Sequence, residues 1–159
     1  MKSVIAMIFM LAVLASKAAH VLQAKNSNEV LNHLQGNNYN VYILFFYDSK
    51  ASDQLTKATN QDIENRLNNV LADNPEFFYS KIDSSDKNFQ DLLDLQLNSD
   101  CLGCTSKNEV GTRSTPSILL IVHGKGVWLT ANNSYLATDR LKDFLPAFKQ
   151  ASAHHTNPY

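Results

Sequence analysis

Residues 41–47 read Val-Tyr-Ile-Leu-Phe-Phe-Tyr, an uninterrupted run of apolar and aromatic side chains. The run has the length of one strand, and its lack of polar alternation predicts a strand that is buried on both faces of a sheet. The next seven residues, Asp48-Ser49-Lys50-Ala51-Ser52-Asp53-Gln54, are polar with one exception. Ser52 or Asp53 can cap a helix at this point. The sequence therefore predicts a central strand, a short polar turn and a helix.

The helix after this turn is expected to pack one face on the sheet, because its apolar residues recur at helical spacing. These residues are Leu55, Ala58, Ile63, Leu67, Val70 and Leu71. Asn74-Pro75 should end the helix, since a residue before proline is disfavoured in the helical conformation.

The segments on either side continue the alternation of strands and helices. We expect a strand at 20–24, a helix from a capping Asn26 to Gly36, a strand at 77–82 and a helix that opens at Asp86. The chain before residue 98 therefore contains three strands and three helices in alternation.

The last part of the chain predicts a hairpin and a helix. After a polar segment at 98–114, an apolar strand at 118–122 runs into a glycine-rich turn, and a second strand follows. Thr138 is expected to cap the last helix, which Pro146 should kink. The whole order is β-α-β-α-β-α-β-β-α, which predicts an α/β domain with a central mixed sheet flanked by helices.

Length and charge limit the classes of function. The chain has 159 residues, 44% hydrophobic residues and a formal net charge of -1, which is typical of one globular domain. No run of lysine or arginine provides the basic stripe that nucleic acid requires, so we expect no nucleic-acid partner. We also expect no cofactor, because no glycine-rich phosphate loop is present.

The N-terminus resembles a targeting segment. Lys2 precedes an apolar run at 4–15, and Ser-Lys-Ala-Ala follows at 16–19, which is the order of a secretory signal peptide. We therefore divide the chain into a signal peptide or membrane anchor at 1–18, a domain at 19–151 and a flexible tail at 152–159. Two alternatives stay open: an uncleaved anchor that associates with a membrane, and a mitochondrial location in the membrane or intermembrane space.

Three short motifs resemble the thioredoxin family. Gly-Thr-Arg-Ser-Thr-Pro-Ser at 111–117 is similar to the family's Gly-Val-Arg-Gly-Ile-Pro-Thr segment, His-Gly-Lys-Gly at 123–126 to its Lys-Asn-Gly turn, and Phe46-Tyr47 to the aromatic pair that ends its central strand. The resemblance covers about residues 20–150. It implies a thioredoxin-like fold with a cis peptide between Thr115 and Pro116, an isomer essentially confined to bonds before proline.

The chain departs from the family where the family performs its chemistry. In the register set by Phe46-Tyr47, the two redox cysteines fall on Ala51 and Gln54, and a shift of one residue gives Lys50 and Asp53. Neither register contains sulfur. The resemblance therefore indicates a member of the fold family that lacks the active-site cysteines.

Two further features of this region argue against catalysis. The family's buried acid falls on Phe45 or Leu44, which cannot transfer protons. Ser49 and Ser52 would need a neighbouring base to act as nucleophiles, and no histidine lies near them in the sequence. Helix capping explains these serines better, so we expect no catalytic residue here.

Cys101 and Cys104 are the only cysteines and have the spacing of a redox motif, but they lie in the polar segment before Pro116. In an oxidising compartment this spacing favours a disulfide in a small loop. A displaced redox pair and half of a metal site stay open as alternatives. We expect no complete metal site. Asn132 begins an Asn-Asn-Ser glycosylation motif, which is meaningful only if the chain enters the secretory pathway.

These observations predict a non-catalytic thioredoxin-like domain that binds protein partners or serves as an accessory subunit of a larger assembly. The resemblance implies that an extended chain is bound at the turn and at the cis-proline, through backbone hydrogen bonds. The candidate binding residues are Ser49, Lys50, Ala51, Ser52, Thr115 and Pro116. The alternative function is a thiol-disulfide oxidoreductase or chaperone that uses Cys101 and Cys104.

Overall fold

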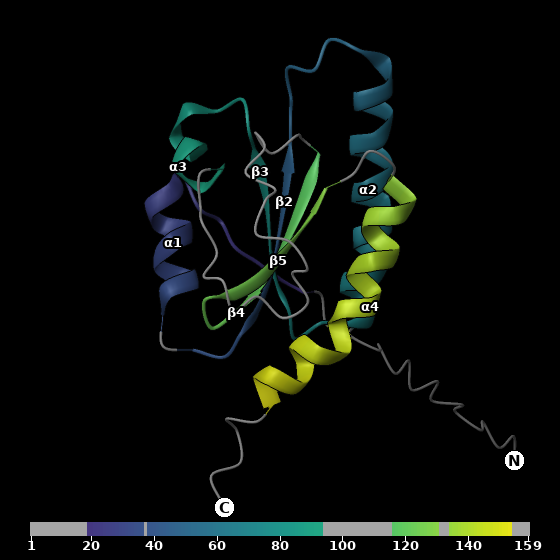
Figure 1. The fold of residues 1–159 in the computed structure, drawn as a ribbon. Helices are drawn as coiled ribbons and strands as arrows, with labels where there is room; N and C mark the ends of the chain where they lie inside the picture. Colours follow the sequence, from purple (N-terminus) through teal and green to yellow (C-terminus); the bar gives the residue numbers. More distant parts are fainter. Residues whose placement is uncertain (1–18, 37, 94–115, 131–133, 154–159) are drawn as a thin grey trace, which may run out of the picture.

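The computed structural model describes residues 19–36, 38–93, 116–130 and 134–153, and a five-stranded mixed sheet forms their centre (Figure 1). The strands are β1 (His20–Val21), β2 (Val41–Tyr47), β3 (Phe78–Asp83), β4 (Ser117–Val122) and β5 (Lys125–Thr130). Their order in the sheet is β1-β3-β2-β4-β5. The first three strands in this order are parallel, and β4 is antiparallel to both of its neighbours.

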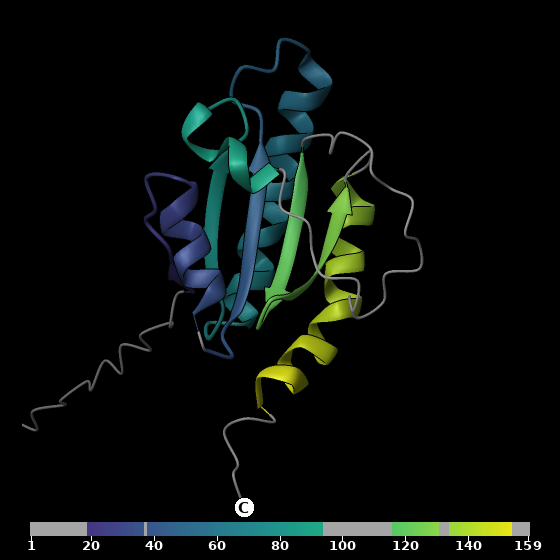
Figure 2. The ribbon, with the colours of Figure 1, turned by 60° about the vertical axis from the view of Figure 1, so that its left-hand side comes forward.

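Helices cover both faces of the sheet (Figure 1, Figure 2). The helices are α1 (Ser27–Gln35), α2 (Gln54–Asp73), the 3₁₀ helix η1 (Lys87–Phe89), α3 (Gln90–Leu93) and α4 (Ser134–Ala153). Helices α1 and α3 lie on one face, and α2 and α4 pack on the other. The predicted order of strands and helices is confirmed. Within the described ranges, none of the helices combines the length and the apolar character needed to cross a membrane.

Side-chain caps fix where the first two long helices begin. The Asn26 side chain accepts a hydrogen bond from the Glu29 N–H, and the Asp53 side chain accepts one from the Thr56 N–H. Each bond satisfies an amide that has no partner inside the helix. The helix start predicted at Asn26 is therefore confirmed, and Asp53 is the N-cap of α2.

The expected start of the last helix was wrong. Helix α4 begins at Ser134, and Thr138 lies inside it with an exposure of 1%. The apolar positions Ala137 and Leu141 on either side of Thr138 are also buried, so this turn of the helix packs on the sheet. Pro146 lies inside α4, as expected, and Figure 1 shows the helix bending in its C-terminal half.

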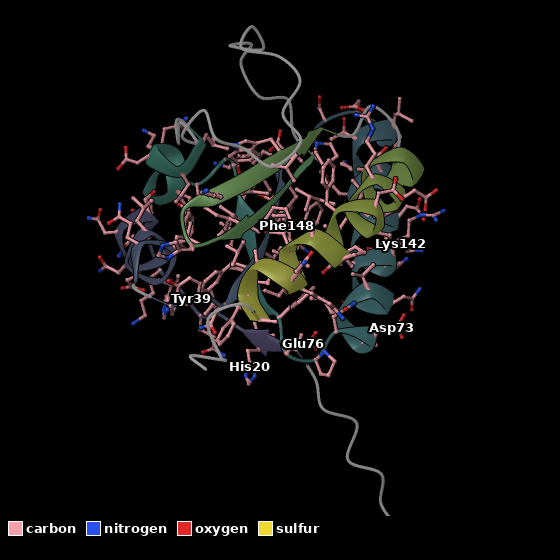
Figure 3. The ribbon with its side chains drawn as sticks, turned by 60° about the horizontal axis from the view of Figure 1, so that its bottom comes forward. His20, Tyr39, Asp73, Glu76, Lys142 and Phe148 are labelled. Atoms are coloured by element: carbon pink, nitrogen blue, oxygen red, sulfur yellow. The ribbon has the colours of Figure 1, made fainter. Side chains whose placement is uncertain are left out.

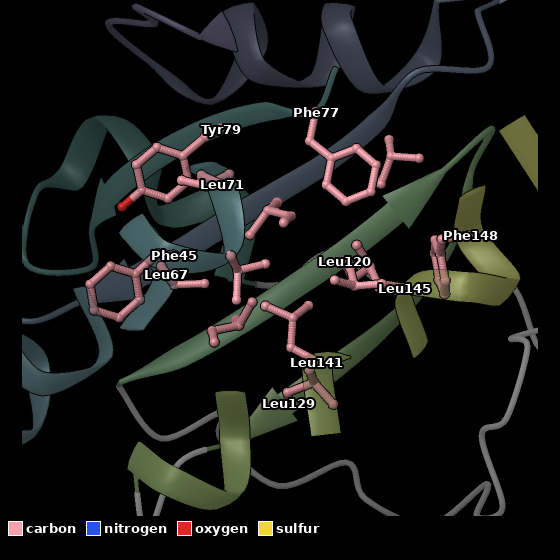
Figure 4. Close-up of a cluster of buried hydrophobic side chains, with 14 of the residues drawn as sticks. Phe45, Leu67, Leu71, Phe77, Tyr79, Leu120, Leu129, Leu141, Leu145 and Phe148 are labelled. Carbon is pink, nitrogen blue, oxygen red and sulfur yellow. The ribbon is translucent and has the colours of Figure 1, made fainter. Parts of the chain in front are cut away.

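The central strand β2 divides the core into two clusters. Its residues alternate between the two faces, and six of the seven are buried. Phe45 belongs to the cluster under α2 and α4, which Figure 4 shows with Leu67, Tyr79, Leu120 and Phe148. The even-numbered residues of β2 belong to the cluster under α1 and α3. The prediction that this strand is buried on both faces is confirmed.

The first turns of α2 do not pack on the sheet, contrary to our expectation. Leu55 is 77% exposed, and Ala58 is exposed as well. Figure 2 shows that the start of α2 extends beyond the end of β2, so these residues have no sheet beneath them. The buried face of the helix begins at Ile63.

Candidate functional site

The topology brings the predicted binding residues to one edge of the sheet. Strands β2 and β3 are parallel, so both end at this edge, at Tyr47 and Asp83. Strand β4 is antiparallel to β2 and begins at Ser117, opposite Phe46. Pro116 is buried just before β4 and therefore lies at the edge where β2 ends. Thr115, the expected partner of Pro116 in a cis peptide, lies outside the described residues.

The turn at 48–53, which we call the binding turn, is held by hydrogen bonds at both ends. The Asp48 side chain accepts from the Lys50 N–H at 2.8 Å, and its backbone carbonyl accepts from the Asn60 side chain at 3.3 Å. Asp53 caps α2 through the Thr56 N–H at 2.7 Å. The binding turn is therefore attached to the helix that follows it.

Within the binding turn, the predicted contact residues differ in exposure. Ser49, Lys50 and Ser52 are exposed, whereas Ala51 is only 9% exposed. Ala51 thus supports the turn from beneath, and three polar side chains are accessible to a partner.

Asp83 connects the binding turn to the end of β3. Its Oδ1 atom accepts from the Ser49 N–H at 3.2 Å, from the Ser85 N–H at 3.0 Å and from the Ser85 hydroxyl at 2.8 Å. The hydroxyl oxygens of Ser49 and Ser85 are 3.1 Å apart. Partial burial raises the pKa of Asp83, but the hydrogen bonds from Ser49 and Ser85 outweigh it and lower the pKa below its ordinary value.

The next serine joins β3 to the end of the central strand. The Ser84 N–H and its hydroxyl both donate to the Tyr47 carbonyl, at 2.8 Å and 2.9 Å. Asp83, Ser84 and Ser85 were missed as site residues in the sequence. The signal that would identify them is an Asp-Ser-Ser run directly after a predicted parallel strand, since neighbouring parallel strands end at the same edge.

In the described residues, the hydroxyls of Ser49 and Ser85 are linked to each other and, through Ser85, to the Asp83 carboxylate. Activation of a serine depends on a neighbouring group that takes its proton. The acidic group that contacts these serines is Asp83, and a carboxyl group with a lowered pKa is a weaker base than usual. The arrangement therefore organises the turn.

At the positions where the resemblance places the family's cysteines, this chain has side chains without sulfur. Ala51 and Gln54 hold the expected cysteine positions, and the alternative register gives Lys50 and Asp53. The Asp53 carboxylate is engaged in capping, and hydrogen bonds from Thr56 lower its pKa. None of these side chains can perform thiol-disulfide exchange.

The position of the family's buried acid is apolar in the structure. Phe45 and Leu44 both have an exposure of 0%, and each belongs to a hydrophobic cluster. Neither can relay a proton between the core and the binding turn.

Several predicted residues fall outside the part of the chain that the structure describes. These are Cys101, Cys104, Thr115 and Asn132, together with the segments 1–18 and 154–159. In the described ranges, His, Cys, Asp and Glu side chains form no group of three that could hold a metal ion. At the end of the domain, α4 continues through Ser152, whose hydroxyl donates to the Tyr39 carbonyl.

Comparison with known proteins identifies the fold. No protein-family model matches the sequence, and no curated protein sequence matches it significantly. Solved thioredoxin structures do match. The short form of thioredoxin f from spinach chloroplast has a TM-score of 0.55 and 12% identity, over 84% of this chain and 96% of that chain.

Thioredoxins from other organisms give similar values. The thioredoxin of Trypanosoma brucei brucei has a TM-score of 0.52 and 14% identity over 87% of this chain and 99% of that chain. Thioredoxin O2 from Arabidopsis thaliana has a TM-score of 0.53 and 11% identity over 82% of this chain and 94% of that chain. The chain therefore has a thioredoxin-like fold of the α/β class. At this level of identity the likeness concerns the fold, and function has to be argued from the site.

Proposed function

We propose that this chain is a redox-inactive thioredoxin-like domain that binds another protein, either as a free module or as an accessory subunit of a larger complex. The observation that carries the proposal is the presence of Ala51 and Gln54 at the family's expected cysteine positions, beside a five-stranded sheet with the thioredoxin-like topology. Phe45 and Leu44, in place of the buried acid, support it further.

The binding turn and Pro116 form the contact surface in this proposal. A rigid turn binds at lower entropic cost than a flexible one, because less conformational freedom is lost on association. The binding turn is attached to α2 through Asp48 and Asp53 and to β3 through Asp83. Ser49, Lys50 and Ser52 remain exposed on it, so the two hydroxyls can donate hydrogen bonds to an extended partner chain or accept them from it, and the Lys50 ammonium can donate.

Leu55 adds an apolar group next to these polar side chains. Among the large hydrophobic residues that the structure describes, only Leu55 and Val21 are exposed, and Leu55 has the larger exposed fraction, 77%. Burial of such a side chain against a partner would contribute about 1.5–3 kcal/mol. The contact surface therefore combines polar groups at the turn with an aliphatic side chain at the start of α2.

A second candidate function rests on Cys101 and Cys104. Their Cys-x-x-Cys spacing is that of a redox pair, and their segment leads into Pro116 at the edge of the sheet where the binding turn lies. A solved complex of ferredoxin:thioredoxin reductase with thioredoxin f2 is among the structures similar to this chain. In this alternative the chain is a thiol-disulfide oxidoreductase or chaperone.

The N-terminal segment directs the chain into the secretory pathway in our proposal, because of its charged, apolar and small-residue order. An uncleaved segment would instead attach the domain to a membrane. Sequencing the N-terminus of the native protein distinguishes these cases: a start at about Ala19 supports secretion, and retention of Met1 supports an anchor or a mitochondrial location.

A reduction assay tests the absence of redox chemistry. The full chain and its Cys104→Ala variant are added to a disulfide-bonded protein substrate with dithiothreitol, and the rate of substrate reduction is measured. We expect both to match the uncatalysed rate. A rate enhancement by the unmodified chain that disappears in Cys104→Ala would contradict the proposal and favour the oxidoreductase.

A further inference from the structure

We propose that Asp83 is the positioning residue of the binding turn: its carboxylate holds Ser49, and thereby the exposed side chains that follow, in the conformation that a partner meets. This inference rests on the proposed function only for its consequence in binding. The positioning itself is a property of the isolated domain and can be measured without a partner.

Three hydrogen bonds converge on one oxygen of Asp83. The donors are the Ser49 N–H, the Ser85 N–H and the Ser85 hydroxyl, at 3.2, 3.0 and 2.8 Å. The Ser49 donor comes from the binding turn, and both Ser85 donors come from the turn after β3. A single carboxylate thus connects Ser49 and Ser85, which are 36 residues apart in sequence. Bonds to an ionised acceptor are stronger than bonds between neutral groups.

The register of the sheet explains why this residue can reach both turns. Asp83 is the last residue of β3 and lies beside Tyr47, the last residue of β2. The backbone on both sides is fixed, because Ser84 donates twice to the Tyr47 carbonyl. The carboxylate therefore projects from a rigid strand end into the space between the two turns.

The other contacts of the binding turn cannot replace Asp83. The Asp48 side chain bonds the Lys50 N–H within the turn, and Asn60 attaches the turn to α2. The bond from the Ser49 N–H to Asp83 and the contact between the Ser49 and Ser85 hydroxyls attach the start of the turn to β3. Because Ser85 is itself held by Asp83, removal of the carboxylate weakens both of these connections.

The test is amide hydrogen exchange of the full chain, resolved at Ser49 and Lys50 and compared with the amides of β2. Asp83→Ala is expected to accelerate exchange at Ser49 about tenfold or more, since a bond to a charged group is lost, while β2 exchanges at its original rate. Asp86→Ala is the matched control. It removes the same charge three residues further along the chain, where the Asp86 side chain accepts from the Asn88 N–H as the N-cap of η1.

A conservative variant distinguishes positioning from general support of the fold. Asp83→Asn keeps an acceptor oxygen and loses the charge, so exchange at Ser49 should lie between the unmodified chain and Asp83→Ala. If Asp83→Ala does not fold, Asp83→Asn and Ser85→Ala carry the test, each with faster exchange at Ser49 and unchanged exchange in β2.

Two results would overturn the inference: unchanged exchange at Ser49 in the Asp83 variants, or equal acceleration in Asp86→Ala. A failure of the proposed function would look different. In that case Asp83→Ala would still release the binding turn, but no partner would be found at it.

Discussion

Replacement of Phe45 by alanine tests whether the position of the family's buried acid is part of the apolar core. Phe45 has an exposure of 0%, and its ring lies 6.0 Å from the ring of Tyr47. A phenylalanine buries about 150–250 Å², which at about 25 cal/mol per Å² corresponds to roughly 4–6 kcal/mol. Alanine retains part of this burial, so we expect a loss of about 3–5 kcal/mol in the free energy of unfolding.

Urea unfolding followed by tryptophan fluorescence measures this loss. The single tryptophan, Trp128, lies with its ring 5.0 Å from the ring of Phe46, in the cluster on the other face of the sheet. With a denaturant slope of roughly 2 kcal/mol per molar, the midpoint of Phe45→Ala should fall by about 1.5–2.5 M.

Leu55→Ala is the matched control for this experiment. Leu55 is 77% exposed, so its removal should change the free energy of unfolding by no more than about 0.5 kcal/mol. A loss below about 1 kcal/mol in Phe45→Ala, or equal losses in the two variants, would refute the account of the core.

Three further variants or conditions test local parts of the structure. Asn26→Ala removes the cap of α1 and should cost about 1 kcal/mol in urea unfolding, whereas Asn26→Ser should restore most of it. Gly126→Ala places a Cβ 2.7 Å from the Leu120 carbonyl oxygen, so the hairpin must shift, at a cost of about 1–3 kcal/mol in the same assay. Asp53 and Asp83 have a pKa below the ordinary 3.8 in the folded chain, so the stability they contribute is present above pH 3.8 and is lost as the pH falls through their folded pKa. The urea midpoint should therefore drop between pH 7 and pH 3, and drop less in a variant with both residues changed to asparagine.

The sequence predicted those parts of the fold in which local chemistry agrees with the tertiary structure. The run at 41–47 is too apolar to tolerate exposure on either face, and both of its faces are buried. Asn26 and Asp53 have side chains that satisfy free amides at a helix start, whatever packs around them. Of the turn predicted at 123–126, only His123 and Gly124 form the turn, because β5 already begins at Lys125. Both residues have positive φ angles, as a type I′ hairpin turn requires.

The failures occurred where packing overrides the local pattern. Leu55 has the spacing of a core residue, but α2 extends beyond the sheet at that point. Thr138 is a residue type that often caps helices, but α4 already begins one turn earlier, at Ser134. A one-dimensional pattern does not contain the relative lengths of a helix and its sheet.

The candidate site was predicted in part. The position of the binding turn could be predicted from the sequence, because the turn comes directly after the central strand and the apolar run identifies that strand and its end. Asp83 and Ser85 were missed, since their role depends on which strand lies next to β2. That neighbour is β3, and the sequence shows only that β3 is the next strand along the chain.

The end of the molecule opposite the binding turn provides a control surface. Figure 3 views the molecule from this end, where β1 and β3 begin and where His20 and Glu76 lie. The C-terminal part of α2 also lies toward this end, and Asn68 is exposed there. At 1.5 Å per residue, Asn68 is about 20 Å along the helix from Gln54.

Site-specific photo-crosslinking in cells tests the central claim most directly. A photo-reactive residue is placed at Ser52 in the binding turn or at Asn68, and the native size of the protein is measured after mild detergent extraction. We predict that position 52 crosslinks to a defined partner protein and that position 68 does not. Migration in a complex above the chain's own 17.8 kDa would favour the accessory subunit, and migration at 17.8 kDa or below would favour the free module. Absence of crosslinks from position 52, or equal crosslinking from both positions, would contradict the account.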